Sequence, residues 1–323
     1  RMGIMHGDNS GLYAACRQVA QMHKALKSEV QAQIWEKQAE IIRLRTNDVC
    51  WNGKFYAHFI PDGSPPPYLK TDLRNSLTLS NPYDVNRGLP TEIMAQSIVQ
   101  TYKDLREKTK NQSFAEWFAM YPEVQPEWAG VKAGTYVNGG VLTIVAGELA
   151  KAALQHGYED YGVDILKRVN ELIKKHNNLP VTYRPDGTID EGIPDNWGQA
   201  AVVSAMIEGL AGVVDKDKLF ENTEISPRWL AAGINQADIT VAYGASQKSV
   251  SYQFQHLNRT LKLTLTGNAK NYTVRIFLPK GIQAGKLTVN GKNMSGTVEK
   301  IRESYYLVAE NINGGKQEIE VKY

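Results

Sequence analysis

The hydrophobic pattern of the chain changes once, about two thirds of the way along it. Before that point apolar residues recur at the helical period and predict six long helices, over 10–26, 28–47, 91–109, 137–156, 158–176 and 196–214. After about Glu224 short runs alternate apolar and polar residues between Gly, Asn and Pro, a pattern typical of an antiparallel β-sandwich. We therefore expect two domains, a helical one over 1–223 and a β-sandwich over 224–323.

The predicted helices are of two kinds. Those that contain GLYAACRQVA, VNGGVLTIVAGELA and NWGQAAVVSAMIEGL are apolar or small on nearly every side, which predicts inner helices surrounded by protein. Those that contain SEVQAQIWEKQAEIIRLR and YGVDILKRVNELIKKH keep one apolar stripe opposite a charged face, as outer helices do. Inner and outer helices in turn predict hairpins arranged as a solenoid or a closed toroid, and the lack of a fixed repeat period disfavours the solenoid.

Composition and charge narrow the class of protein. A chain of 323 residues with 42% hydrophobic and 22% charged residues is an ordinary globular mixture, which excludes a fully disordered chain or a membrane bundle. The net charge is +3 and the two signs are interleaved, so we expect no nucleic-acid partner. No apolar run reaches the roughly 18 residues that a membrane span needs. The cysteines and histidines lack metal-ligand spacing, so we expect neither a metal nor a cofactor.

The candidate chemistry lies in the loops that enter the inner helices. Their sequences are MHGDNSGLY, NPYDVNRGLP, GTYVNGG and RPDGTIDEGIPDNWGQ, and each mixes acids or amides with aromatic residues and glycines. In a helical toroid the N-terminal ends of inner helices open on one face, so these loops would converge there. They predict a polar pocket with aromatic walls.

Sugars suit such a pocket, because a pyranose stacks its C–H face on an aromatic ring and offers hydroxyls to carboxylates and amides. The candidate stacking platforms are Trp197, Tyr136 and Tyr83. The candidate hydroxyl-binding residues are Asn138, Asn196, Asp84 and Arg87, with His6 as a further binding residue. The alternative interpretation is that Trp197 packs the start of its helix and that the asparagines are caps.

Several segments together resemble a known enzyme family. HGDNSGLYAACRQVAQMHKAL, WEKQAEIIRLR and CWNGKFYAHFIPDG resemble the second half of the six-hairpin (α/α)6 glycosidases, which include amylo-glucosidase-like hydrolases and cellobiose-type phosphorylases. GTYVNGGVLTIVAGELAKAAL is similar to the Asn-Gly-Gly helix start of those enzymes. NWGQAAVVSAMIEGLAGV followed by ISPRW looks like their last inner helix and the approach to their C-terminal β-domain.

The resemblance implies a fold and its surroundings. It implies a mainly α, multidomain protein with half or more of an (α/α)6 toroid, followed by a small antiparallel β-sandwich. It further implies a carbohydrate substrate, an upstream segment of the same precursor that completes the toroid, and a periplasmic or secreted location. One motif departs from the family: the phosphorylases carry an Asp-Trp-Asn-Asp acid motif where this chain has only His6-Gly7-Asp8-Asn9, which weakens a phosphorolytic interpretation.

Glycosidic hydrolysis needs two carboxyl groups, one to protonate the leaving oxygen and one to activate water or attack the sugar. Asp8 is a candidate acid or sugar ligand, with a helix-capping role as its alternative. Glu191, or failing it Asp190, is the candidate general base, with a solvated loop acid as the alternative. Glu148 and Glu208 interrupt apolar helices, and Glu208 lies about 16 Å below Trp197 along the helix, so we expect structural roles for them.

The sequence thus predicts a glycoside hydrolase that acts on an oligosaccharide or a polysaccharide-derived glycan. Inversion follows from the resemblance, since these toroids favour a base that activates water. The alternatives are a glycoside phosphorylase, which would release a sugar 1-phosphate only with phosphate, and a non-catalytic carbohydrate-binding or scaffold protein.

Overall fold

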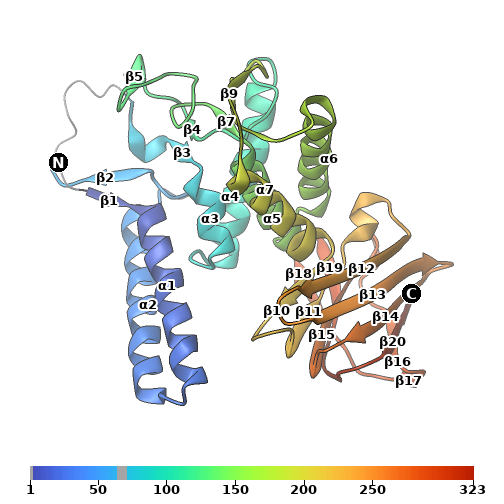
Figure 1. The fold of residues 1–323 in the computed structure, drawn as a ribbon. Helices are drawn as coiled ribbons and strands as arrows, with labels where there is room; N and C mark the ends of the chain where they lie inside the picture. Colours follow the sequence, from blue (N-terminus) through green and yellow to red (C-terminus); the bar gives the residue numbers. More distant parts are fainter. Residues whose placement is uncertain (1–2, 64–70) are drawn as a thin grey trace. The chain divides into compact units, whose positions relative to one another are not determined.

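The computed structural model describes residues 3–63 and 71–323 (Figure 1). Contacts divide the chain into two compact units that are interleaved in sequence. The first unit is Arg1–Ala152 with Lys167–Val202, and the second is Ala153–Leu166 with Val203–Tyr323. These units describe packing, whereas the domains 1–223 and 224–323 would be tested by folding each part alone, so the domain boundary stays a prediction.

The long helices lie close to the ranges that the hydrophobic period predicts. They are α1 (His6–Ala25), α2 (Glu29–Cys50), α4 (Glu92–Thr109), α5 (Thr143–Gln155), α6 (Glu159–His176) and α7 (Asn196–Ser204). A short helix, α3 (Ser80–Asn86), was not predicted. The last predicted helix, over 196–214, is divided: α7 ends at Ser204 and a π-helical segment, Ala205–Leu210, follows it. Short 3-10 segments occur at Leu73–Asn75 and Trp229–Ala232.

The segments between these helices form small sheets, which the sequence did not predict. The pairs are β1 (Gly3–Met5) with β2 (Phe59–Pro61), β3 (Leu77–Thr78) with β4 (Met120–Tyr121), and β5 (Glu127–Trp128) with β6 (Val131–Lys132). A three-stranded sheet has the order β7 (Val141–Leu142), β8 (Pro180–Tyr183) and β9 (Ile189–Pro194). Buried loop backbone must pair its N–H and C=O groups, and pairing with another loop achieves this.

The expected fold class, mainly α with half or more of an (α/α)6 toroid, is therefore wrong. Helices hold 38% of the residues and strands hold 32%, so the protein mixes α and β structure. The error has a physical cause. The two- to six-residue strands of the first unit are too short to show an alternating pattern of apolar and polar residues, so the sequence does not reveal them.

The second unit is built on two sheets with a shared core. The five-stranded sheet has the order β10 (Val213–Asp215), β11 (Asn222–Ile225), β15 (Asn271–Phe277), β19 (Ser304–Asn313) and β18 (Thr297–Ile301). The six-stranded sheet has the order β12 (Gln236–Tyr243), β13 (Lys248–Leu257), β14 (Thr260–Gly267), β20 (Gln317–Lys322), β16 (Lys286–Val289) and β17 (Lys292–Asn293). Ile225 and Val274 of the first sheet and Val250 and Leu263 of the second are buried in one apolar cluster.

The strand directions differ from the prediction at one place. Strands β11 and β15 pair in parallel, so these sheets are not purely antiparallel. The hairpin between β16 and β17 is as predicted: Asn290 and Gly291 connect them, with φ values of 50° and 74°.

The α1–α2 hairpin shows how the inner-helix prediction failed in part. Figure 1 shows the two helices side by side, and their buried positions include Tyr13 and Ala20 on α1 and Ala32 on α2. Small residues there let the helices approach closely. The opposite side of α1 is open, however, with Leu12 53% and Met22 63% exposed. Helix α1 is therefore not surrounded by protein, whereas most of α5 is buried, as expected.

Gly212 offers a test of the backbone after the π-helical segment. Its φ is 68°, and a Cβ there would overlap the Ser226 carbonyl oxygen. Ser226 is held close to Gly212 because the Ser226 N–H donates a hydrogen bond to the Gly212 carbonyl. We expect Gly212→Ala to lower the free energy of unfolding by about 3 kcal/mol, since left-handed strain and a backbone clash add. Gly233→Ala is the matched control: φ is 74° with no atom within 4 Å of the new Cβ. It should cost about 1 kcal/mol. Equal losses in urea unfolding would contradict the clash.

Candidate functional site

His6, the first residue of α1, and Asp84, in the second half of α3, meet in the interior of the first unit. The His6 Nδ1 atom hydrogen-bonds Asp84 Oδ2, and His6 Nε2 lies 3.2 Å from Thr78 Oγ1. The side chains are 1% and 0% exposed, and the Tyr56 ring stacks on the imidazole at 5.7 Å. The pair therefore joins the start of α1 to the second half of α3, two helices that are distant in sequence. Its role in binding sugar stays a prediction.

Arg87 and Tyr83 lie beside this pair, closer to the surface. An Arg87 guanidinium nitrogen donates to the Gly7 carbonyl at 3.1 Å and to Ser10 Oγ at 2.8 Å. The guanidinium carbon lies 5.0 Å from the centre of the Tyr83 ring, within cation–π range. Arg87 thus ties α3 to the first turn of α1 and holds Tyr83 in place.

Two acids that were not predicted as site residues lie near Tyr83. Burial raises the pKa of Tyr83 to about 12, with the charge of Glu148 as the next cause and a smaller effect from Asp195, while Arg87 opposes the rise. Asn86 Nδ2 donates to Glu148 Oε2 at 2.5 Å and to the Glu148 carbonyl at 2.9 Å. We call Tyr83, Arg87, Glu148 and Asp195 the helix-start cluster.

Asp195 supports the start of α7. Its Oδ1 accepts a hydrogen bond from Trp197 N at 3.1 Å, and its Oδ2 accepts one from Thr143 Oγ1 at 3.4 Å. The side chain is 7% exposed. An aspartate immediately before a helix is a standard N-cap, so this signal was present in the sequence and was missed. Glu148 interrupts an apolar helix, and its position within that helix predicted a structural role. Such a position does not show which neighbour the side chain meets.

The second group of predicted residues lies on β9. Asp190 Oδ1 accepts a hydrogen bond from Arg184 Nε at 3.0 Å, and its Oδ2 accepts one from Tyr136 N at 3.2 Å. The register slips by one residue here, since Tyr183 pairs with Ile189 but Thr182 pairs with Glu191. Asp190 is therefore the extra residue of a β-bulge, a feature that redirects side chains and is frequent beside active sites.

Glu191 is half-buried and differs from Asp190 in its contacts. Within the described residues it forms no side-chain hydrogen bond or ion pair. The segment Arg184 to Pro194 was expected to be a loop, but it includes β9, an edge strand of its sheet. An edge strand tolerates Gly and Pro because one of its sides needs no pairing partner.

The remaining predicted residues are dispersed around these groups. Trp197 is 77% exposed and Asn196 is exposed beside it, at the start of α7. Tyr136 is 42% exposed and Asp8 is exposed in the first turn of α1. Asn138 is fully buried: its Oδ1 accepts from Val124 N at 2.8 Å and its Nδ2 donates to two carbonyls. Asn138 therefore holds its own loop together, and its contact with a sugar stays a prediction.

The buried imidazole of His58 should make the free energy of unfolding depend on pH. Burial lowers its pKa to about 4, with a smaller effect from His6, and its ring meets Trp128 edge-on at 5.2 Å. The unfolded chain binds a proton near pH 6.5, so the folded state is fully favoured above that pH and loses about 3 kcal/mol as pH falls to 4. We expect His58→Phe to remove this loss. Urea unfolding at pH 7 and pH 4.5 checks it, and an unchanged pH dependence would contradict the assignment.

The described residues contain neither a group of metal ligands nor a helix that could span a membrane. Among residues 3–63 and 71–323, no group of three His, Cys, Asp or Glu side chains could hold a metal ion. In the same ranges, no helix combines the length and the apolar character that crossing a membrane requires.

Comparison with known proteins identifies the fold. No family model matches the chain, and no curated protein matches it in sequence. Three solved structures are similar. An α-L-rhamnosidase from Dictyoglumus thermophilum has a TM-score of 0.60 at 11% identity, over 96% of this chain and 31% of that chain. The GH78 rhamnosidase of Bacillus sp. GL1 has a TM-score of 0.56 at 15% identity, over 86% of this chain and 26% of that chain. A sialidase has a TM-score of 0.57 at 14% identity, over 96% of this chain and 27% of that chain.

The chain shares the fold of part of these glycosidases. At such identities the likeness concerns the backbone, so it assigns no role to any residue. The chain also spans less than a third of the length of each of the three proteins. The activity of the whole molecule is therefore a matter of proposal.

Proposed function

We propose that this chain carries part of the active site of a glycoside hydrolase that acts with inversion on an oligosaccharide or a polysaccharide-derived glycan. The observation that carries the proposal is the start of α7. There the open indole of Trp197 comes three residues after the end of β9, which holds Asp190 and Glu191. Sugar binding uses an exposed aromatic ring, and hydrolysis uses carboxylates; this short segment supplies both.

In this proposal the residues divide the work. A sugar ring stacks on Trp197, with Tyr136 and Asn196 beside it. Glu191 removes a proton from the attacking water, because it is the acid of β9 without another partner among the described residues. Asp190, which Arg184 and Tyr136 N hold in place, positions the strand. Asp8, exposed at the start of α1, is the candidate acid or a ligand of the sugar.

The test is an assay of the full-length natural protein against a panel of glycans, with and without inorganic phosphate. Release of reducing sugar without phosphate, with the product anomer inverted in NMR spectra, supports the proposal. Release of a sugar 1-phosphate that requires phosphate would replace it with phosphorolysis. Binding of glycans without turnover would replace it with a carbohydrate-binding or scaffold role. We also propose a periplasmic or secreted location, which cell fractionation tests.

We further propose that helices from an upstream segment of the same precursor cover the open side of α1. Apolar side chains on this side and at the two ends of the helix are exposed among the described residues: Met5 37%, Leu12 53%, Met22 63% and Leu26 76%. Leu12 and Met22 lie on the helix itself, on the side away from its buried residues, and Met5 and Leu26 flank its two ends. Such exposed apolar side chains are typical of a helix that packs on another helix.

Amide hydrogen exchange tests whether upstream helices cover α1. In the full-length protein, amides of α1 and α2 should exchange more slowly than in the 323-residue chain alone, because covering helices would protect them. The two sheets of the second unit serve as the internal control. Equal exchange of α1 in both proteins would overturn the proposal.

A further inference from the structure

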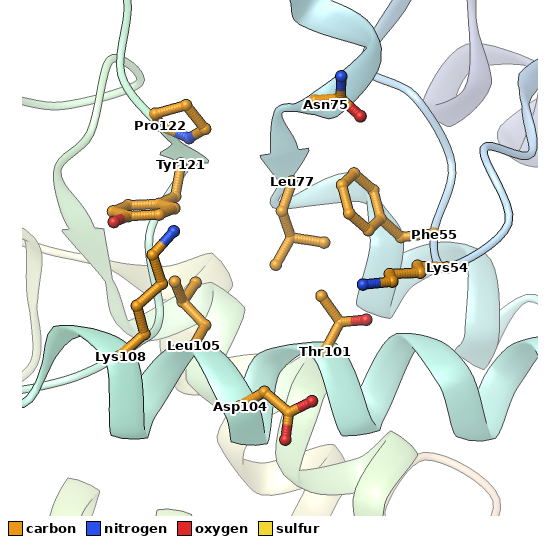
Figure 2. Close-up of a pocket in the computed structure, with 10 residues that line it drawn as sticks. All are labelled: Lys54, Phe55, Asn75, Leu77, Thr101, Asp104, Leu105, Lys108, Tyr121 and Pro122. Carbon is orange, nitrogen blue, oxygen red and sulfur yellow. The ribbon is translucent and has the colours of Figure 1, made fainter.

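A hollow of about 280 Å³ opens in the first unit, between α4 and strands β3 and β4. Figure 2 shows Leu77, Phe55 and Leu105 facing it, with Tyr121 and Pro122 on one side. The three apolar side chains are buried and form the floor of the hollow. It shares no residue with the helix-start cluster or with β9. The hollow is therefore separate from the proposed active site.

Two lysines lie on opposite sides of this apolar floor. Lys54 extends over it from the side of Phe55, and Lys108 extends from α4 (Figure 2). The Lys108 ammonium lies 5.3 Å from the centre of the Tyr121 ring. Neither lysine forms an ion pair with an acid in the part of the chain that the structure describes. Two ammonium groups that no acid pairs with outnumber the single carboxylate of the lining, Asp104, and so favour an anion at this rim.

The rim also offers groups that bind hydroxyls. Thr101 and Asp104 line the hollow from α4, and Asn75 lines it from the opposite side (Figure 2). One Asp104 oxygen, Oδ1, accepts a hydrogen bond from Gln100 Nε2 at 2.7 Å. The second carboxylate oxygen and the Thr101 hydroxyl can accept from a ligand hydroxyl. The lining thus combines cations, hydroxyl-binding groups and an aromatic face.

We propose that this hollow is a binding site for one carboxylated sugar unit of the hexuronic acid class. The lysines bind the carboxylate, Tyr121 stacks on the apolar C–H face of the ring, and Asp104 and Asn75 bind hydroxyls. The volume lies just below the range of roughly 300–1,000 Å³ of small-molecule sites, which suits a single sugar ring. The inference goes beyond the proposed hydrolysis, because it concerns binding at a place that contains none of the candidate catalytic residues.

The experiment is a titration of the full chain with D-galacturonate and D-glucuronate, read by calorimetry and by saturation-transfer NMR. D-galactose and D-glucose serve as neutral probes, and benzoate and inorganic phosphate as anions without a sugar ring. We expect the uronates to bind more tightly than all four. The double variant Lys54→Ala, Lys108→Ala should weaken uronate binding about tenfold or more, since a charge-assisted hydrogen bond is worth at least that ratio.

Two further variants make the test specific. Tyr121→Ala should also weaken uronate binding, because it removes the stacking face. Lys103→Ala, on α4 but outside the hollow, is the matched control and should leave binding unchanged. Uronate binding that is absent, that is unaffected by the double variant, or that is no tighter than binding of the neutral sugars, benzoate or phosphate would overturn the proposal. Since the readout is binding, failure of the hydrolase proposal would not produce any of these results.

Discussion

Glu191→Gln should reduce turnover by a factor on the order of 10²–10⁴, the range that acid–base catalysis contributes. The amide keeps the size of the carboxylate but cannot take a proton from water. Glu191 follows the bulge at Asp190 and comes just before the exposed Trp197, so the lost group belongs to the region where a sugar would stack. The measurement is kcat on the substrate that the glycan panel identifies, with sugar binding measured separately.

Asp190→Asn is the comparison variant for this prediction. Asp190 is engaged by Arg184 and by Tyr136 N, so its loss should affect the position of β9 and act mainly on KM. Glu191→Gln should unfold at nearly the wild-type urea concentration, because Glu191 forms no side-chain hydrogen bond or ion pair within the described residues. If kcat is unchanged in both Glu191→Gln and Asp190→Asn, the base lies elsewhere. The helix-start cluster, with Glu148 and Asp195, is then the next place to search.

Arg168→Ala should lower the free energy of unfolding by roughly 3–5 kcal/mol, the cost of leaving a buried charge without its partner. The two terminal guanidinium nitrogens of Arg168 donate to the two Glu116 oxygens at 2.9 and 2.8 Å. Glu116 is fully buried, and the guanidinium carbon lies 4.6 Å from the centre of the Trp117 ring. The substitution removes the fork and the cation above the indole, and it leaves the carboxylate in the interior.

Two further variants separate charge from shape at this pair. Arg168→Lys keeps the positive charge but loses the two-pronged geometry, so it should cost less than Arg168→Ala. The double variant Arg168→Ala, Glu116→Gln should recover part of the loss, since a neutral amide costs less to bury than a carboxylate. Urea unfolding at pH 7 measures all three. A loss below about 1 kcal/mol for Arg168→Ala would mean that the ion pair contributes little to stability.

The hydrophobic period predicted most of the long helices and their approximate ends. Helices α2, α4 and α6 combine an apolar stripe with a charged opposite face, and their ends lie within a few residues of the predicted ones. Apolar residues at the helical period fall on one face only when the backbone is helical, so such segments are predictable from the sequence. The start of α5 was predicted six residues too early, because residues 137–142 are apolar and small and also suit the strand β7.

The candidate site was predictable in its residue types and not in its pairings. The segments MHGDNSGLY and NPYDVNRGLP stand out for their acids, amides and aromatic residues. They were expected to be loops but lie largely in α1 and α3, which the structure joins through His6, Asp84 and Arg87. The partner of each side chain was not readable, since Asn138 turned out to clamp its own loop. The position of Asp195 before a helix indicates a cap in the sequence, but its hydrogen bond to Thr143 is known only from the structure.

Local interactions account for what the residues alone decided about this protein: the long helices, the short strands after Glu224 and the turn at Asn290-Gly291. Each of these depends on neighbours within a few positions, so a window of sequence contains the cause. Tertiary packing decided the rest. The small sheets of the first unit, the parallel pair of β11 with β15, and the buried contacts of Glu116 and Asp84 each join segments that are distant along the chain. Their free energy comes from partners that no local pattern encodes.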